Sequence, residues 1–151
     1  MHFGQNRDQL RQFYLDSWRK YRAGAALEPM ERVVAEVVAE HPEYHKLLEA
    51  SDRALEREYL PGGGETNPFL HMGLHIALRE QIAAERPAGI AAAYRDVVNA
   101  VSDRHKAEHA MIECLAEALW RAQRDGTPPD ENAYLREINR LARKTASGQK
   151  R

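Results

Sequence analysis

Residues 67–89, NPFLHMGLHIALREQIAAERPAG, decide how this chain folds. Asn67 is a residue type that caps helix N-termini, and Pro68 suits the first helical position, so a helix is expected to begin here. Apolar residues then recur at helical spacing until the Glu-Arg-Pro-Ala-Gly run at 85–89, which should stop the helix. The stretch therefore predicts one helix, from about residue 68 to 86, followed by a turn.

Two pairs of histidines flank this turn. His71 and His75 form the first pair, and His105 and His109 form the second. Each pair has the spacing i, i+4, which places both rings on the same face of a helix. If a second helix runs from about residue 91 to 124, the two helices form an antiparallel hairpin. Residues 71 and 109, and residues 75 and 105, are equidistant from residue 90, so all four rings are expected at one height.

Buried imidazoles that converge from two helices are typical of a transition-metal site, as in metal-binding helical bundles. A bound ion would also satisfy polar ring atoms that otherwise cost about 1–3 kcal/mol each when buried without a partner. The predicted metal ligands are His45, His71, His75, His105, His109 and Glu113. Glu113 follows His109 by one helical turn, and His45 would come from a third helix. Glu108, Glu80 and His41 are further candidates, and Pro42 weakens the case for His41 because it interrupts the helix.

The chain contains one cysteine, Cys114, which excludes an internal disulfide and a thiolate-cluster metal site. Nitrogen and oxygen ligands suit several transition metals, and iron and zinc are the leading candidates. Four histidines alone could close a tetrahedral structural zinc site, whereas six ligands are enough for two ions, with iron favoured. If one coordination position stays open, the metal could activate water or a small molecule such as dioxygen.

Three other interpretations compete with the metal site. The histidines could form a metal-free polar layer in a non-enzymatic helical adaptor that binds a partner through its exposed helix faces. They could also make the bundle respond to pH, because four buried imidazoles cannot all become charged together. Finally, residues 105–109, HKAEH, formally match the His-x-x-Glu-His signature of one class of zinc protease, although no peptide cleft is evident.

Nearly all of the chain has helical periodicity, with no convincing strand. The expected helices run from about 7 to 22, from 29 to the proline at 42, from 68 to 86, from 91 to 124 and from 131 to 143, with a glycine-rich connector at 60–66. Short connections favour antiparallel neighbours. The predicted fold is therefore all-α, an up-and-down four-helix bundle with an additional C-terminal helix. Residues 1–143 would form one domain, and residues 144–151 a flexible polar tail.

The bulk composition of the 151 residues excludes some classes of function. The net charge is −1 with 30% charged residues, which gives no electrostatic reason to bind nucleic acid or an anionic membrane. The chain has no apolar segment of membrane-spanning length and no signal-peptide pattern, so a cytoplasmic location is expected. The aromatic stripe of the first helix is interpreted as core, with a homodimer face as the alternative; it comprises Phe13, Tyr14, Trp18 and Tyr21.

Several stretches resemble an uncharacterised bacterial family of short helical proteins, known as a domain of unknown function. They are FYLDSWRKYRAG (13–24), HPEYHKLL (41–48), NPFLHMGLHIALREQ (67–81), PAGIAAAY (87–94), residues 105–123 and residues 128–130. The resemblance covers most of the chain but implies no activity. At the level of architecture, the histidine pattern is also similar to two metal-binding bundle families, the hemerythrin-like proteins and the damage-inducible bundles. The match to the first is poor, because its His-x-x-x-Glu is missing.

Overall fold

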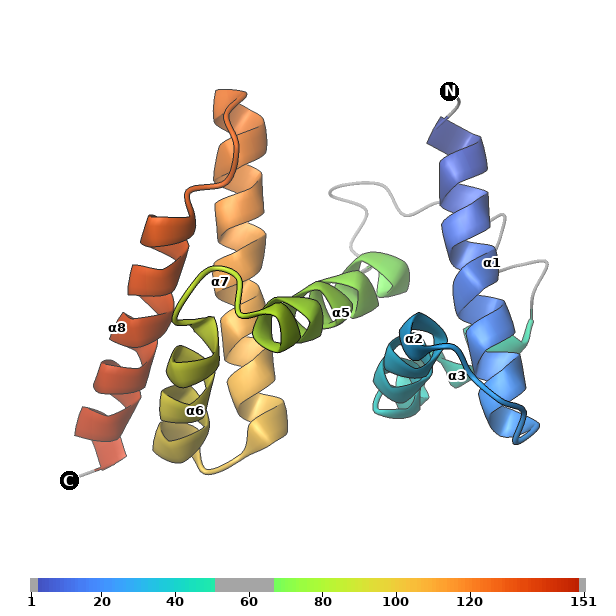
Figure 1. Ribbon diagram of the computed structural model, residues 1–151, viewed down its shortest axis with the longest axis horizontal. Helices are drawn as coiled ribbons and strands as arrows, with labels where there is room; N and C mark the ends of the chain where they lie inside the picture. Colours follow the sequence, from blue (N-terminus) through green and yellow to red (C-terminus); the bar gives the residue numbers. More distant parts are fainter. Residues whose placement is uncertain (1–2, 51–66, 150–151) are drawn as a thin grey trace. The chain divides into compact units, whose positions relative to one another are not determined.

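The computed structural model describes residues 3–50 and 67–149, and every regular element in these ranges is a helix. The elements are α1 (Phe3–Arg22), α2 (Pro29–Ala39), the 3-10 helix η1 (Pro42–Tyr44), α3 (His45–Glu49), α5 (Pro68–Ala84), α6 (Ile90–Val101), α7 (Arg104–Asp125) and α8 (Glu131–Gln149) (Figure 1). The all-α class is thus confirmed. The predicted connector at 60–66 lies outside the described residues. None of the described helices combines the length and the apolarity that a membrane crossing requires.

Contacts divide the chain into two compact units, Met1–Ile76 and Ala77–Arg151, with the boundary inside α5. Each unit has its own set of packed helices, and the predicted four-helix bundle is not confirmed. The first unit holds α1, α2, η1, α3 and the N-terminal half of α5. The second holds the rest of α5 with α6, α7 and α8.

Local chemistry explains where the helices of the first unit begin. Pro29 opens α2, and a capping box precedes it, in which the backbone N–H of Glu28 donates to the Glu31 carboxylate at 2.9 Å. Asn67 caps α5, because its side-chain oxygen accepts from the backbone N–H of Phe69 at 3.0 Å. Both helix starts were predicted correctly from the sequence.

The core of the first unit joins α1 to α2, α3 and the start of α5. Its buried members are Tyr14, Leu15, Trp18, Val34, Val37, Val38, Leu48, Phe69, Met72 and Ile76. The rings of Tyr14 and Phe69 stack with their centroids 5.5 Å apart. A Cβ atom at Gly73 would lie 3.4 Å from the Tyr14 hydroxyl, so the small residue lets α5 approach α1 closely. The aromatic stripe of α1 therefore contributes two residues, Tyr14 and Trp18, to the core, while Tyr21 stays exposed.

Tyr14 gives the first unit a predicted response to alkaline pH. Its side chain is only 3% exposed, and burial raises the pKa of the phenol from 10.0 to about 12. Because the unfolded chain releases this proton near pH 10 and the folded chain only near pH 12, folding stability should fall as the pH rises between these values. We expect a loss of about 1–3 kcal/mol, which Tyr14→Phe should abolish. Urea unfolding of both proteins at pH 9 and pH 11.5 measures the difference, and equal pH dependence would contradict it.

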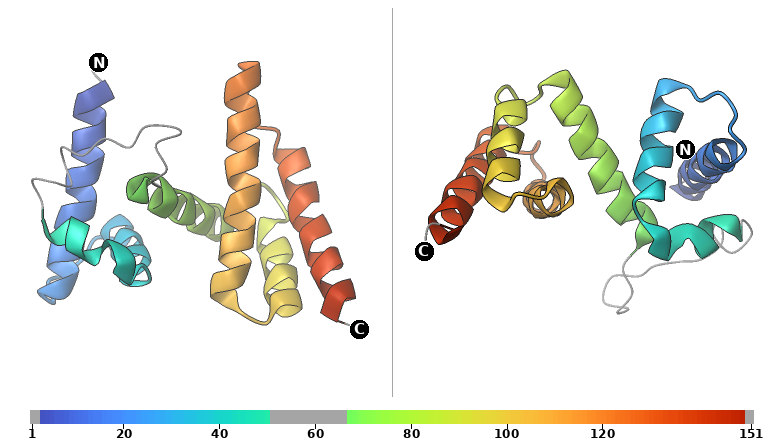
Figure 2. Two further views of the ribbon diagram at one scale, coloured as in Figure 1. Left: turned by 180° about the vertical axis from the view of Figure 1, so that it is seen from behind. Right: turned by 90° about the horizontal axis from the view of Figure 1, so that it is seen from below.

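In the second unit, α6 packs against both α7 and α8. The three helices lie side by side in Figure 1 and in both views of Figure 2. The buried apolar residues of this unit are Leu78, Ile90, Ala93, Val97, Ala100, Ala107, Met111, Ile112, Leu115, Tyr134, Ile138 and Ala142. The helix predicted to end near residue 143 continues to Gln149. Gly126 caps α7 in the left-handed conformation with φ 66°, which agrees with the predicted stop.

The helix predicted from 91 to 124 is broken, which corrects the hairpin expected from the sequence. Ser102 has φ 61°, and Asp103 caps a new helix by accepting from the backbone N–H of Lys106 at 3.1 Å. The antiparallel hairpin is therefore formed by α6 and α7, instead of by α5 and one long helix. The physical reason is the Ser-Asp pair, whose short polar side chains favour helix N-termini over helix interiors. The equal sequence separation of the two histidine pairs from residue 90 therefore does not place their rings at one height.

Candidate metal centre

His41 lies between α2 and η1, with its ring turned back onto α2. It is 2% exposed, and its Nδ1 atom lies 2.7 Å from the backbone oxygen of Val37. A carbonyl oxygen can only accept a hydrogen bond, so Nδ1 carries the proton and Nε2 carries the lone pair. Histidines that bind metals typically have their second nitrogen fixed by such a bond. The Nε2 atom of His41 could therefore bind a metal ion.

His71 and His75 share one face of α5, as their spacing predicted. Their Nε2 atoms are 3.3 Å apart, and their ring centroids 4.9 Å apart in an edge-to-face arrangement. Nitrogens bound to one tetrahedral zinc ion at 2.0–2.1 Å are about 3.3–3.4 Å apart, so the observed separation fits two ligands of the same ion. His75 is only 1% exposed, while His71 is half-buried.

The three rings meet inside the first unit and form what we call the histidine cluster: His41, His71 and His75. The centroid of His41 lies 5.2 Å from that of His71 and 4.7 Å from that of His75. Each residue offers a ring nitrogen, and these atoms all lie within 4.8 Å of one another. Among the described residues, no carboxylate or thiol joins this group. The cluster is therefore a set of neutral nitrogen donors, which suits zinc, copper, nickel or iron better than magnesium or calcium.

Tyr44 borders the histidine cluster. Its ring stacks on His41 with an interplanar angle of 7° and centroids 5.7 Å apart, and meets His71 edge-on at 6.3 Å. Val37 and Val38, on the neighbouring turn of α2, are fully buried. An aromatic ring and apolar side chains thus surround the donors. Low polarity around a metal site strengthens the interaction of the ion with its ligands.

His45, which was also predicted as a ligand, has other partners in the first unit. Its Nε2 atom lies 2.8 Å from the backbone oxygen of Val38, and its ring packs on Trp18 with centroids 4.5 Å apart. The structure does not bring it into the histidine cluster. The indole ring of Trp18 and the carbonyl oxygen of Val38 are the partners that hold the His45 ring in this position. His41, which the sequence ranked below His45, is the member of this pair that the cluster contains.

The other predicted ligands lie on α7, in the second unit. The rings of His105 and His109 are adjacent, with centroids 4.4 Å apart, so the spacing of this pair is also confirmed. His105 is exposed, whereas His109 is half-buried. Glu113 is exposed and lines a cleft between α7 and α8. Of the three predicted ligands on α7, the two histidines are therefore adjacent, and Glu113 lies on the wall of the cleft beside α8.

Two further carboxylates were candidates. Glu108 is buried and accepts a hydrogen bond from Nε of Arg79 at 3.0 Å, which makes it the partner of a cation on α5. Glu80 is exposed. Among the described residues, neither belongs to the group of side chains that could share an ion. A buried carboxylate is stable when a guanidinium neutralises it, and this pairing explains the position of Glu108 in the interior of the unit.

The fold and the histidine cluster define a small all-α protein whose buried imidazoles could hold a metal ion. Residues 6–140 match the family model described as Domain of unknown function (DUF1841), and the chain belongs to this family. The expected membership in an uncharacterised family of short helical proteins is thereby confirmed. Neither a curated protein nor a solved structure matches the chain.

Proposed function

We propose that this protein binds one transition-metal ion through Nε2 of His41, His71 and His75 in the first unit, with zinc as the preferred ion. The observation that carries the proposal is the geometry of the three rings of the first unit. One ring has its proton fixed on Nδ1 by a backbone carbonyl, and the other two have their Nε2 atoms at the separation of two zinc ligands.

The choice of zinc over iron rests on the donor set. Non-haem iron sites of the common oxygenase type combine two histidines with a carboxylate, and two-iron bundles use several carboxylates. The histidine cluster contains imidazoles alone among the described residues. Three imidazoles fill three of the four positions of a tetrahedral zinc ion, and the fourth position can then hold a water molecule.

The metal content of untagged protein tests the proposal. After dialysis against micromolar zinc and then against buffer, we expect one zinc per wild-type chain and none in His41→Ala or His75→Ala. His105→Ala is the matched control, because this exposed histidine of α7 should be dispensable. Equal zinc content in all variants, or none in the wild type, would contradict the proposal.

A metal-free polar layer is the second candidate. It is favoured by the hydrogen bonds that the rings already make, from His41 to Val37 and between His71 and His75. These bonds satisfy part of the buried polar surface without an ion. In that case the histidines would be structural parts of a helical adaptor, and the wild type would retain no zinc after dialysis. The same measurement therefore separates the two functions.

A further inference from the structure

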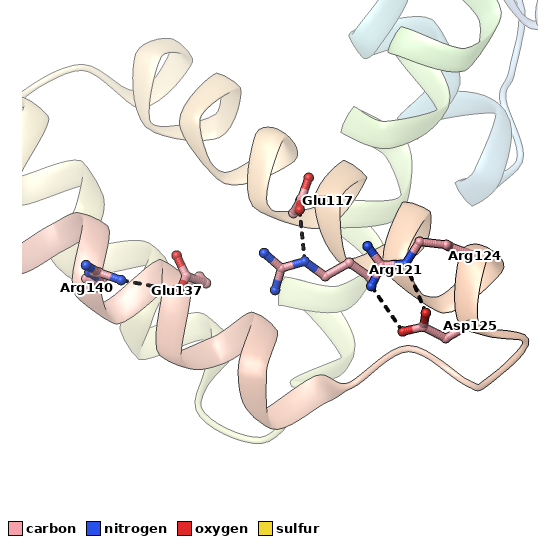
Figure 3. A network of polar contacts seen from close by, with 6 residues as sticks. All are labelled: Glu117, Arg121, Arg124, Asp125, Glu137 and Arg140. Carbon is pink, nitrogen blue, oxygen red and sulfur yellow. Dashed lines mark hydrogen bonds and ion pairs between the residues drawn. The ribbon is translucent and has the colours of Figure 1, made fainter.

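The second unit contains a cleft between α7 and α8 that the proposed metal site does not use. Its volume is about 590 Å³, which lies within the range of small-molecule binding sites. Residues of α7, of α8 and of the connection between them line it. Figure 3 shows polar side chains of both helices around this region.

Small side chains on α7 create the cleft. Ala110, Cys114, Ala118 and Ala122 recur every fourth residue and form one wall, and Ala133 and Leu141 of α8 add to the apolar lining. Because the side chains on this face of α7 are small, they leave the space beside this part of α8 unfilled. An apolar floor is thus left open beside α8, large enough for a hydrocarbon chain.

The charges around this floor are mostly negative. The lining contains five carboxylates and two guanidinium groups, namely Glu113, Glu117, Asp125, Asp130 and Glu137 against Arg121 and Arg136. Three carboxylates have local partners: Glu117 pairs with Arg121 at 2.9 Å, Asp125 pairs with Arg124, and Asp130 caps α8 by accepting from the N–H of Ala133 (Figure 3). The two others are Glu113 on α7 and Glu137 on α8. Glu137 lies 3.8 Å from Arg140 in a long, exposed contact, which stabilises little.

The pKa of the Cys114 thiol depends on both of these carboxylates. Burial raises the pKa of Cys114, and the negative charges of Glu137 and Glu113 raise it further. Charges from opposite walls therefore act on the same point of the cleft. A carboxylate pair over an apolar floor is complementary to a cationic nitrogen attached to a hydrocarbon body.

We propose that the cleft between α7 and α8 binds an organic amine, with its ammonium group between Glu113 and Glu137 and its hydrocarbon body on the alanine-rich floor. The inference is independent of the metal site, because none of these residues belongs to the histidine cluster. The ligand class follows from the negative charges of Glu113 and Glu137, which line the same cleft, and from its apolar floor.

The only cysteine of the chain makes the cleft directly measurable. Cationic and anionic methanethiosulfonates each convert the Cys114 thiolate into a disulfide and release methanesulfinate. Relative to their rates with a small free thiol, we expect the cationic reagent to modify Cys114 at least about tenfold faster than the anionic one, because two nearby carboxylates attract it. The double variant Glu113→Gln, Glu137→Gln should lose this preference. The matched control, Glu80→Gln with Glu131→Gln, removes the same charge from exposed positions outside the lining and should keep it.

Binding itself is tested with spermidine as the probe amine. Spermidine should slow the alkylation of Cys114 by neutral iodoacetamide several-fold in the wild type and in the control variant, and not in the Glu113→Gln, Glu137→Gln variant. Sodium chloride at the same ionic strength measures simple screening. The proposal is overturned if spermidine protects no more than salt does, or if the double variant and its control behave alike in both assays. Circular dichroism confirms that each variant is folded.

Discussion

Zinc at a hundred times its dissociation constant should raise the free energy of unfolding of the metal-free protein by about 2.7 kcal/mol, and at a thousand times by about 4.1 kcal/mol. The reason is linkage: three ligands of the proposed site meet only in the folded first unit, where His41 follows α2 and the other two lie on α5. For a chain of this size, the melting temperature should rise by roughly 5–16 °C over this range. Scanning calorimetry with and without zinc measures the shift.

Variants decide whether this stabilisation comes from the histidine cluster. His75→Ala should lower the stability of the metal-free protein and, more importantly, remove its response to zinc. His105→Ala should keep the full response, because His105 is exposed and lies outside the group that could share an ion. A zinc-induced shift of the same size in His75→Ala would mean that the ion binds elsewhere, and the proposed ligands would be wrong.

Removal of the Tyr14 ring should have the largest effect of any single core substitution tested. Tyr14→Ala deletes a buried ring that stacks on Phe69, and losses of this kind cost about 3–5 kcal/mol. Since small domains are stable by only about 5–15 kcal/mol, much of the first unit's stability would be lost. Phe69 lies two residues before His71, so the start of α5 should also move and zinc affinity should fall.

Leu10→Ala is the control for this substitution. Leu10 precedes Tyr14 by one turn on the same helix but is 54% exposed, so its removal should change stability by no more than about 0.5 kcal/mol. Urea unfolding of the wild type and both variants gives the comparison. If Tyr14→Ala and Leu10→Ala cost the same, the packing of α5 against α1 described here is wrong.

Features set by neighbouring residues could be predicted from the sequence. The start of α2 at Pro29 and of α5 after Asn67 depend on capping and proline chemistry within one turn, and both were correct. The spacing of His71 and His75, and of His105 and His109, fixed their adjacency because helix geometry is local. The break at Ser102 could also have been predicted, because Asp103 is a strong capping residue. The apolar periodicity on both sides of it favoured one continuous helix instead.

The composition of the histidine cluster could not be predicted in the same way. Which rings meet depends on how helices pack, and this is decided by the whole core. We expected Pro42 to make His41 a weaker candidate, because this proline interrupts the helix. In the structure, the interruption turns the His41 ring onto the carbonyl oxygen of Val37. His45 was ranked above it, but Trp18 and the carbonyl of Val38 hold its ring. Glu113 shares an approximate helix face with His109 and nevertheless lines the cleft beside α8.

X-ray absorption spectroscopy at the zinc edge tests the proposed ligands, because it reports the atoms bound to the ion. We expect a first shell dominated by nitrogen at about 2.0–2.1 Å, with the outer-shell scattering of three imidazole rings. His105→Ala should leave this spectrum unchanged, and His75→Ala should remove it. A first shell made of oxygen, a sulfur ligand at about 2.3 Å from Cys114, or a spectrum that His75→Ala does not alter would contradict the proposal.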